Sequence, residues 1–231
     1  MRDAEEAVYT TISRALLAGR LAPGTPLREP ALAEVFGISR ERVRKILQRL
    51  GTNRLIELVP NRGAFVAMPS LEQARDIYEA RRILEVGIVG HLAPMLGDAD
   101  ADRLRRHLQR EAEAMRADDR AESVRLSAQF HVLLAEATGN VFVVQQMQEL
   151  VSRTSMLVAV YESAGAAQCG CDEHQDIFTS LLKGDGTGAG KAMRAHLSLI
   201  ETRLKPRVRE PDRDAATVLR AIWAETMAGT S

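Results

Sequence analysis

The chain of 231 residues is long enough for two modest domains, each with its own hydrophobic core. Hydrophobic residues make up 45% of it and charged residues 27%, and no apolar run approaches the ~20 residues of a membrane-spanning helix, which argues against a membrane protein. The net charge is zero, but residues 1–68 hold 11 basic and 7 acidic residues while the remainder holds 20 and 24. A basic head on an acidic body suits a protein that presents one end to phosphates.

The N-terminal residues and the cysteines indicate a protein of the cytoplasm. Asp3, Glu5 and Glu6 stand where a secretory signal peptide needs a basic and then an apolar stretch. Cys169 and Cys171 are too few and too close together for a disulfide framework, and they are also too few for a thiolate metal site to be predicted. We therefore expect a cytoplasmic location and no membrane partner.

The first 68 residues predict three helices followed by a pair of strands. Apolar residues recur at helical spacing in three segments, which are separated by the turn-rich residues 21–26 and by Gly37. Ser39 stands where it can cap the third helix. Two short apolar runs then flank the turn at residues 60–63. These elements are expected at residues 5–19, 30–36, 39–50, 55–59 and 64–67. Their order predicts a winged helix-turn-helix domain.

The third of these helices carries the residues that we expect to read DNA. A helix-turn-helix places its second helix in the major groove, where the first residues of that helix meet base edges. Arg40 and Arg44 lie one helical turn apart and so share a face, while Arg42 and Lys45 flank them within reach of phosphates. A solvated basic face is the alternative for an isolated helix. The preceding helix, the turn, the cap and the wing favour DNA.

The N-terminal domain resembles the GntR family of bacterial regulators over nearly its whole length. The resemblance rests on Gly19-Arg20-Leu21-Ala22-Pro23-Gly24-Thr25-Pro26-Leu27-Arg28-Glu29, on Leu32-Ala33 through Phe36-Gly37-Ile38-Ser39-Arg40 and Val43-Arg44, and on the wing residues Pro60-Asn61-Arg62-Gly63-Ala64-Phe65-Val66. It implies that arginines of the recognition helix read a short palindrome and that the wing-tip glycine approaches the minor groove. It places at the DNA Ser39, Arg40, Arg42, Arg44 and Gly63.

Other residues of this domain complete the expected DNA contacts. Two departures from the family pattern limit what the resemblance implies about the operator sequence. We expect Arg28, Lys45, Asn61 and Arg62 to contact the DNA as well. Pro30 stands where the family usually has arginine, a contact that Arg28 can supply, and Glu41-Arg42 stands where Thr-Pro is common. The operator sequence therefore does not transfer from the family.

The chain after Pro69 reads as one helix after another, with no strand pattern. Ser70 is placed to cap the first of these helices, and loops are expected at residues 165–170 and 184–190. Pro206 and Pro211 delimit a linker before a last amphipathic helix. The helices are expected from Leu71 and over about residues 99–117, 121–138, 141–162, 172–182, 191–205 and 214–227. We expect a mainly α protein with a winged helix-turn-helix at 1–68, an all-helical effector domain at 70–205, and a linker with a C-terminal helix at 206–231.

Three histidines of the helical part form a second candidate site. His131, His174 and His196 lie on three different expected helices. Neutral imidazole is a common ligand of divalent metals, and three imidazoles can hold zinc while leaving a position open. A histidine at a helix interface is more often simply packed or hydrogen-bonded. The residue types alone leave both interpretations open.

The same region resembles the FCD-type effector domain of the FadR subfamily over about residues 71–204. The resemblance rests on residues 130–140, on Glu173-His174 and on residues 193–197. Many members bind a divalent metal through one aspartate and three histidines, and the aspartate position is occupied here by Ser127. The resemblance implies a zinc or nickel ion on His131, His174 and His196. A polar pocket that binds its ligand without metal is the alternative.

An effector site is expected beside these histidines. Glu79-Ala80-Arg81-Arg82-Ile83-Leu84-Glu85 resembles the first helix of the same domain, in which the position of Arg81 points into the pocket and can pair with a carboxylate. We expect a small organic acid as the effector, bound by Arg81, Ser127 and Asn140.

The sequence therefore predicts a ligand-responsive transcriptional regulator, a repressor that binds operator double-stranded DNA. We expect a homodimer, because palindromic operators mirror the two-fold symmetry of the protein. The alternatives are a metal-dependent enzyme built on a helical bundle and a DNA-binding regulator with a metal-free pocket. The winged head argues against the enzyme, as does the lack of a candidate general acid or base beside the histidines. We therefore expect no catalytic residues.

Overall fold

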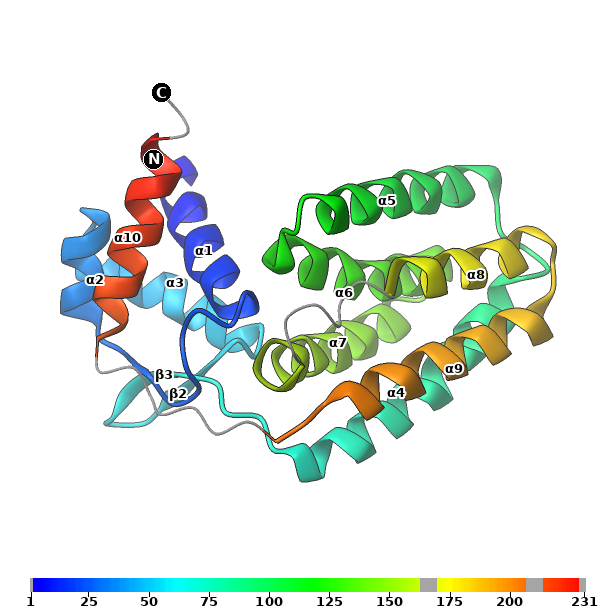
Figure 1. The fold of residues 1–231 in the computed structure, drawn as a ribbon, viewed down its shortest axis with the longest axis horizontal. Coiled ribbons are helices and arrows are strands. Elements are labelled where there is room, and N and C mark those ends of the chain that lie inside the picture. Colours follow the sequence, from blue (N-terminus) through cyan, green and yellow to red (C-terminus); the bar gives the residue numbers. More distant parts are fainter. Residues whose placement is uncertain (1, 163–169, 207–213, 229–231) are drawn as a thin grey trace. The chain divides into compact units, whose positions relative to one another are not determined.

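A computed structural model describes residues 2–162, 170–206 and 214–228 (Figure 1). The chain forms two compact units, one of residues 1–69 together with 207–231 and one of residues 70–206. The second unit is thus inserted into the sequence of the first. The C-terminal helix that was predicted within residues 206–231 packs within the first unit.

Three helices of the first unit confirm the predicted helix-turn-helix: α1 (Arg2–Leu17), α2 (Glu29–Phe36) and α3 (Arg40–Thr52). Gly37 ends α2 with a φ of +64°, a left-handed conformation that glycine adopts without strain. Ser39 then caps α3, its side chain accepting a hydrogen bond from the backbone N–H of Arg42. The apolar stripe of α3 is buried against the other helices. It consists of Val43, Ile46, Leu47 and Leu50.

The wing is a small antiparallel sheet of β1 (Pro26–Leu27), β2 (Ile56–Val59) and β3 (Gly63–Val66) in the order β1-β3-β2. The predicted pair of strands is confirmed, with Leu58 opposite Ala64. The sequence did not predict β1, in which Pro26 pairs with Phe65. Two residues are too few to show the alternation by which strands are predicted.

Helix α10 (Ala215–Ala228) completes the first unit. It packs against α2, α1 and β1, and Figure 1 shows it in red beside α1 and α2. Its Leu219 is fully buried, and the Trp223 ring meets the Phe36 ring edge-on at a centroid distance of 5.2 Å. The predicted bounds of this helix, 214–227, differ from the observed ones by one residue at each end.

The second unit is built from helices over the residues that the structure describes, as predicted. The closest neighbours are α4 with α9, α8 with α9, and α6 with α5 and α7. Its core contains Tyr78 and Phe130, both with 0% exposure. None of the described helices combines the length and apolarity needed to cross a membrane. The helices are α4 (Leu71–Leu92), α5 (Asp98–Arg116), α6 (Arg120–Ala137), α7 (Val141–Tyr161), α8 (Gly170–Leu182) and α9 (Gly186–Arg203).

The start of α9 corrects a prediction. The glycine-rich segment 184–190 was expected to be a loop, but α9 begins at Gly186 and Asp185 caps it by accepting a hydrogen bond from the N–H of Gly188 at 2.8 Å. A Cβ at Gly186 would lie 3.4 Å from the carbonyl oxygen of Gly90 on α4. Glycine therefore stands here because α9 begins against the backbone of α4. Residues 165–169 of the predicted loop at 165–170, with Cys169, lie outside the described residues, whereas Gly170 already begins α8. The linker proline Pro211 and the side chain of Cys171 also lie outside the described residues.

Candidate functional site

A groove between the helix-turn-helix and the wing gathers most of the predicted DNA-binding residues of the first unit. It runs between the N-terminal ends of α2 and α3 on one side and the β2–β3 turn on the other. Gln48, which the sequence did not single out, lies one helical turn after Arg44 and also lines it. The predicted residues that line the groove are Arg28, Arg40, Arg44, Asn61, Arg62 and Gly63.

Arg44 is held in place by Glu29 from the first turn of α2. Its Nε and Nη2 donate to the two carboxylate oxygens at 2.9 and 2.8 Å, a two-pronged pair. The hydrogen bonds from Arg44 lower the pKa of Glu29, so the pair is ionised at neutral pH. The Arg44 side chain is still 60% exposed, which leaves its other N–H groups available to a ligand. Glu29 thus orients a guanidinium that remains open to the groove.

The other predicted DNA-binding residues of α3 lie outside the groove. Arg42 forms an ion pair with Glu5 of α1 at 3.3 Å, and Lys45 forms one with Glu41 at 3.2 Å. Ser39 is the N-cap of α3. Exposed pairs of this kind are weak, so Arg42 and Lys45 can exchange their partners for phosphates.

The wing tip depends on two residues in the left-handed region of the backbone. Asn61 has a φ of +60° and Gly63 a φ of +99°. The turn is closed by a hydrogen bond from the N–H of Arg62 to the carbonyl oxygen of Val59. No atom lies within 4 Å of where a Cβ of Gly63 would stand, so the glycine is required by its backbone conformation rather than by crowding.

The three predicted histidines of the second unit converge in its interior. His131 of α6, His174 of α8 and His196 of α9 are each at most 2% exposed. The Nε2 atoms of His174 and His196 are 3.1 Å apart, and those of His196 and His131 are 3.3 Å apart. Phe130 stacks on the His174 ring at a centroid distance of 4.2 Å and closes one side of the cluster.

Each histidine of this cluster has a carboxylate at its other ring nitrogen. Glu111 of α5 lies 2.9 Å from Nδ1 of His174, and Glu173 lies 2.6 Å from Nδ1 of His196. Glu85 of α4 lies 2.5 Å from Nδ1 of His131, a close contact that falls outside hydrogen-bond geometry. Carboxylates accept hydrogen bonds, so the ring protons belong on Nδ1 and the Nε2 atoms face one another as lone pairs.

Such an arrangement suits a metal ion. Three lone pairs that face one another without protons repel, and a cation among them removes the repulsion. Two nitrogens on one zinc ion at about 2.05 Å lie about 3.3 Å apart when the geometry is tetrahedral, which is close to the distances from Nε2 of His196 to Nε2 of His174 and of His131. Carboxylates that accept from Nδ1 are the usual support for metal-binding histidines. The three side chains could thus hold a divalent ion.

The protonation of the cluster agrees with this interpretation. Burial lowers the pKa of His131 to about 4 and that of His196 well below its ordinary value. Burial works to raise the pKa of Glu85, but the charge of Arg81 and the contact with His131 outweigh it and lower that pKa to about 2. At neutral pH the two histidines are therefore neutral and the carboxylate beside them is ionised.

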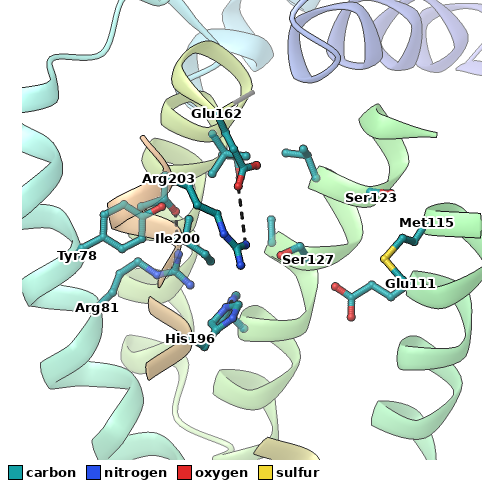
Figure 2. Close-up of a pocket in the computed structure, with 16 residues that line it drawn as sticks. Tyr78, Arg81, Glu111, Met115, Ser123, Ser127, Glu162, His196, Ile200 and Arg203 are labelled. Atoms are coloured by element: carbon teal, nitrogen blue, oxygen red, sulfur yellow. Dashed lines mark hydrogen bonds and ion pairs between the residues drawn. The ribbon is translucent and has the colours of Figure 1, made fainter. Parts of the chain in front are cut away.

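A cavity of about 70 Å³ adjoins the cluster, with His131 and His196 in its wall. Figure 2 shows Arg81, Ser127 and His196 around it. Ser127 lies on α6 one turn before His131, so it faces the cavity where a carboxylate would have added charge to the site. The cavity has room for roughly five waters, which is the size of a small organic molecule of a few atoms.

Arg81 and Tyr78 bring unused hydrogen-bond donors to this cavity. Arg81 donates from Nε to Glu85 at 2.6 Å and from Nη1 to Thr154 at 3.0 Å. Among the described residues, its Nη2 and the hydroxyl of Tyr78 have no hydrogen-bond partner, although both side chains are almost fully buried. Buried donors without partners are costly, and an oxygen-rich ligand would satisfy both.

A second arginine, Arg203 of α9, lines the same cavity and was not predicted. Its guanidinium lies 3.1 Å from Glu173 and 4.0 Å from Glu162, and the latter contact is dashed in Figure 2. Glu173 therefore joins Arg203 to His196, just as Glu85 joins Arg81 to His131. Two series of side-chain contacts, each of an arginine, a glutamate and a histidine, thus connect the cavity wall to the cluster.

The structure does not support Asn140 as an effector ligand. Asn140 is exposed and is the N-cap of α7, where its side-chain oxygen accepts hydrogen bonds from the N–H groups of Phe142 at 3.0 Å and Val143 at 3.3 Å. It does not line the cavity. Its place after Gly139, whose φ is +68°, is that of a residue that starts a helix.

Comparison with known proteins agrees with both domains. Residues 4–66 match the model of the bacterial regulatory proteins of the gntR family, and residues 76–199 match that of the FCD domain. The chain is a GntR-family regulator with an FCD domain. The regulator therefore binds DNA through its winged helix-turn-helix and responds to a small ligand through its helical unit.

Relatives of the regulator extend over most of its length. It is 26% identical to the HTH-type transcriptional repressor RspR of Escherichia coli K12 over 210 residues, which cover 90% of this chain and 91% of the relative. It is 27% identical to the HTH-type transcriptional regulator LutR of Bacillus subtilis, covering 79% and 93%. A GntR transcriptional regulator from Rhodococcus sp. RHA1 has a similar structure, with a TM-score of 0.72, 25% identity and coverage of 86% and 95%.

Sequence reasoning missed five residues that complete the sensory site of the regulator. Glu85 follows Arg81 by four residues, so their pairing on one helix face was visible in the sequence. The others come together through packing between helices, which no local pattern records. They are Tyr78, Glu111, Glu173 and Arg203.

Proposed function

We propose that the protein is a repressor whose FCD domain holds a divalent metal ion, zinc or nickel, together with a small organic acid. It acts as a cytoplasmic homodimer on operator double-stranded DNA. Arg28, Arg40, Arg44, Asn61, Arg62 and Gly63 contact the operator within the groove, and Ser39, Arg42 and Lys45 do so beside it. The observation that carries the sensory part of the proposal is the set of three inward Nε2 atoms, each backed by a carboxylate at Nδ1.

DNA reading is assigned to Arg40 and Arg44. Both line the groove. Glu29 fixes the orientation of the Arg44 guanidinium, which bidentate hydrogen bonding to a base requires. In gel shifts on promoter DNA of adjacent genes, Arg40→Ala or Arg44→Ala should weaken specific binding roughly tenfold or more. Arg62→Ala should weaken binding to all sequences and flatten its salt dependence. Unchanged specific affinity in both α3 variants would refute the assignment.

The metal is assigned to His131, His174 and His196. When bound, it supplies positive charge and open coordination positions at the wall of the cavity. Ser127 adds no charge at the neighbouring position, so Ser127→Asp should tighten metal binding. Ser123→Asp is the matched control, because Ser123 also lines the cavity but lies two turns from His131. Elemental analysis of protein purified without a nickel column gives the occupancy. Metal-free protein whose melting does not respond to added zinc would favour the metal-free pocket.

The effector is assigned as a small carboxylate. Arg81 Nη2 and the Tyr78 hydroxyl supply donors on one side of the cavity and the histidine cluster lies on the other. A short hydroxy or keto acid has oxygens for both, and its size suits a cavity of about 70 Å³. A thermal-shift screen of hydroxy, keto and sugar acids, followed by release from the operator, tests this. A neutral or hydrophobic effector would overturn the assignment and leave the DNA-binding function untouched.

Family membership supports a regulator over the metal-dependent enzyme. In this proposal the metal organises a ligand rather than a reaction. The homodimer follows from the symmetry of palindromic operators. Equilibrium sedimentation with and without operator measures the oligomeric state directly. A protein that stays monomeric in solution and binds each operator half-site independently would contradict the homodimer.

A further inference from the structure

The C-terminal helix α10 is an addition to the two family domains. The GntR match ends at residue 66 and the FCD match at residue 199, whereas α10 begins at Ala215. This helix nevertheless belongs to the compact DNA-binding unit and not to the effector unit that precedes it in the sequence. Its function is therefore to be sought in DNA binding.

Helix α10 packs most extensively against α2, the helix that precedes the recognition helix, and almost as extensively against α1. Trp223 meets Phe36 at the end of α2 in an edge-on ring contact at 5.2 Å, an arrangement that aromatic pairs prefer. Arg220 forms an ion pair with Glu34 of α2 at 3.0 Å, an exposed and therefore weaker contact that adds to the ring pair. Helix α10 also packs against β1, which ends two residues before α2 begins. It thus contacts the last turn of α2 and the strand that leads into the first turn.

The position of α2 matters for DNA reading because Glu29 stands in its first turn. Glu29 holds the guanidinium of Arg44 through two hydrogen bonds. A shift or tilt of α2 would move the carboxylate and with it the fork that Arg44 presents to the groove. Glu34, the partner of Arg220, lines the same groove.

We propose that α10 positions the DNA-reading arginine Arg44: Trp223 and Arg220 fix α2, and α2 fixes Arg44 through Glu29. This inference rests on the proposed role of Arg44 in reading the operator. Trp223 and Arg220 are positioning residues that touch no DNA, and they make sequence discrimination depend on the last helix of the chain. The effector unit is then joined at both of its ends to the elements that read DNA.

The test uses full-length protein and an operator selected by the wild type from random duplexes. Trp223→Ala should lower operator affinity about tenfold, the effect of losing one two-pronged base contact, and change affinity for unrelated DNA by less than about twofold. Trp223→Phe keeps an aromatic ring against Phe36 and should retain most of the discrimination. Glu225→Gln, an exposed change on the same helix, is the matched control and should have no effect.

A purely structural role of α10 would give a different result. All affinities are measured at a temperature at which circular dichroism shows the variants folded, so that loss of stability alone leaves the ratio of specific to unrelated binding unchanged. In a Glu29→Gln background, where α2 no longer holds Arg44, Trp223→Ala should cause no further loss of discrimination. If Trp223→Ala does not fold, Arg220→Ala tests the same support with an expected loss of about threefold.

Several results would overturn the proposal. These are an unchanged ratio in Trp223→Ala, equal losses on operator and unrelated DNA, and a full additional loss in the Glu29→Gln background. Arg44→Ala separates this failure from failure of the proposed function. If Arg44→Ala weakens operator binding and Trp223→Ala does not, only the role of α10 is wrong. If Arg44→Ala has no effect, the proposed reading of DNA by Arg44 is itself wrong.

Discussion

Both carboxylate oxygens of Glu111 lie 2.9 Å from Nδ1 of His174, across the contact between α5 and α8. Glu111 is 4% exposed and His174 is not exposed at all, so water does not replace this contact. We predict that Glu111→Gln weakens zinc binding by about 10- to 100-fold, because a neutral amide supports the imidazole less well than a carboxylate does. Competition with a chromophoric chelator measures the affinity.

Glu113→Gln is the control for this prediction. Glu113 lies on the same helix but is exposed, so the change removes the same charge without touching the cluster. Equal zinc affinity in Glu111→Gln and Glu113→Gln would mean that His174 does not bind the ion. An equal loss in both would mean that the effect is one of overall charge.

Asn140 provides a prediction about stability rather than ligand binding. Its side chain caps α7 through the N–H groups of Phe142 and Val143. Asn140→Ala should lower the free energy of unfolding by about 1 kcal/mol, while Asn140→Ser should leave it nearly unchanged. Chemical denaturation measures the change. Zinc and effector affinities should be unaltered in both variants, and a selective loss of effector binding in Asn140→Ala would restore the prediction made from the sequence.

The sequence predicted what local patterns record. The helix-turn-helix and the wing follow from apolar spacing, Gly37 and Ser39, and the resemblance to a known domain favoured the three histidines as a metal site. The carboxylates that contact those histidines could not be predicted from the sequence. Glu111 and His174 are 63 residues apart, and only the packing of α5 on α8 brings them together. The predicted effector role of Asn140 stays a prediction, because the structure shows this side chain capping α7, a position that a residue after glycine at a helix start favours.

Prediction of the fold was limited in the same way, because local patterns do not record contacts between distant segments. Strand β1 has two residues, too few for a pattern, and forms because β3 offers it a partner. The glycines of residues 184–190 indicated a loop, but close packing of α9 on α4 requires small residues and overrides their low helix propensity. The apolar face of α10 was visible in the sequence, whereas its partner α2 was not.

The pair of Glu29 and Arg44 predicts a variant with altered specificity. Glu29→Gln removes an acidic group from the groove and frees the guanidinium. Affinity for unrelated DNA should rise slightly, because phosphates no longer face this carboxylate, and discrimination between operator and unrelated DNA should fall roughly tenfold. Fluorescence anisotropy at two salt concentrations measures both. A uniform loss of affinity on all sequences would mean that Glu29 supports the fold rather than orienting Arg44.

Tyr78 offers the sharpest test of the effector site. Its hydroxyl is buried at the cavity and has no hydrogen-bond partner among the described residues. Burial raises the pKa of Tyr78, so the phenol keeps its proton and can donate it to a ligand oxygen. Removing an unsatisfied buried hydroxyl does not cost stability in the ligand-free protein. Tyr78→Phe should therefore melt at the same temperature as the wild type or higher.

The same variant should bind the effector more weakly. A hydrogen bond to a charged group contributes about 1.5–3 kcal/mol, which corresponds to a loss of affinity of roughly tenfold or more. Calorimetric titration with the acid found in the thermal-shift screen measures it, and Arg81→Lys, which keeps a positive charge beside Glu85 but loses the Nη2 donor, should show a comparable loss. Lower stability of Tyr78→Phe with unchanged effector affinity would contradict this prediction, because the hydroxyl would then serve the core and not the ligand.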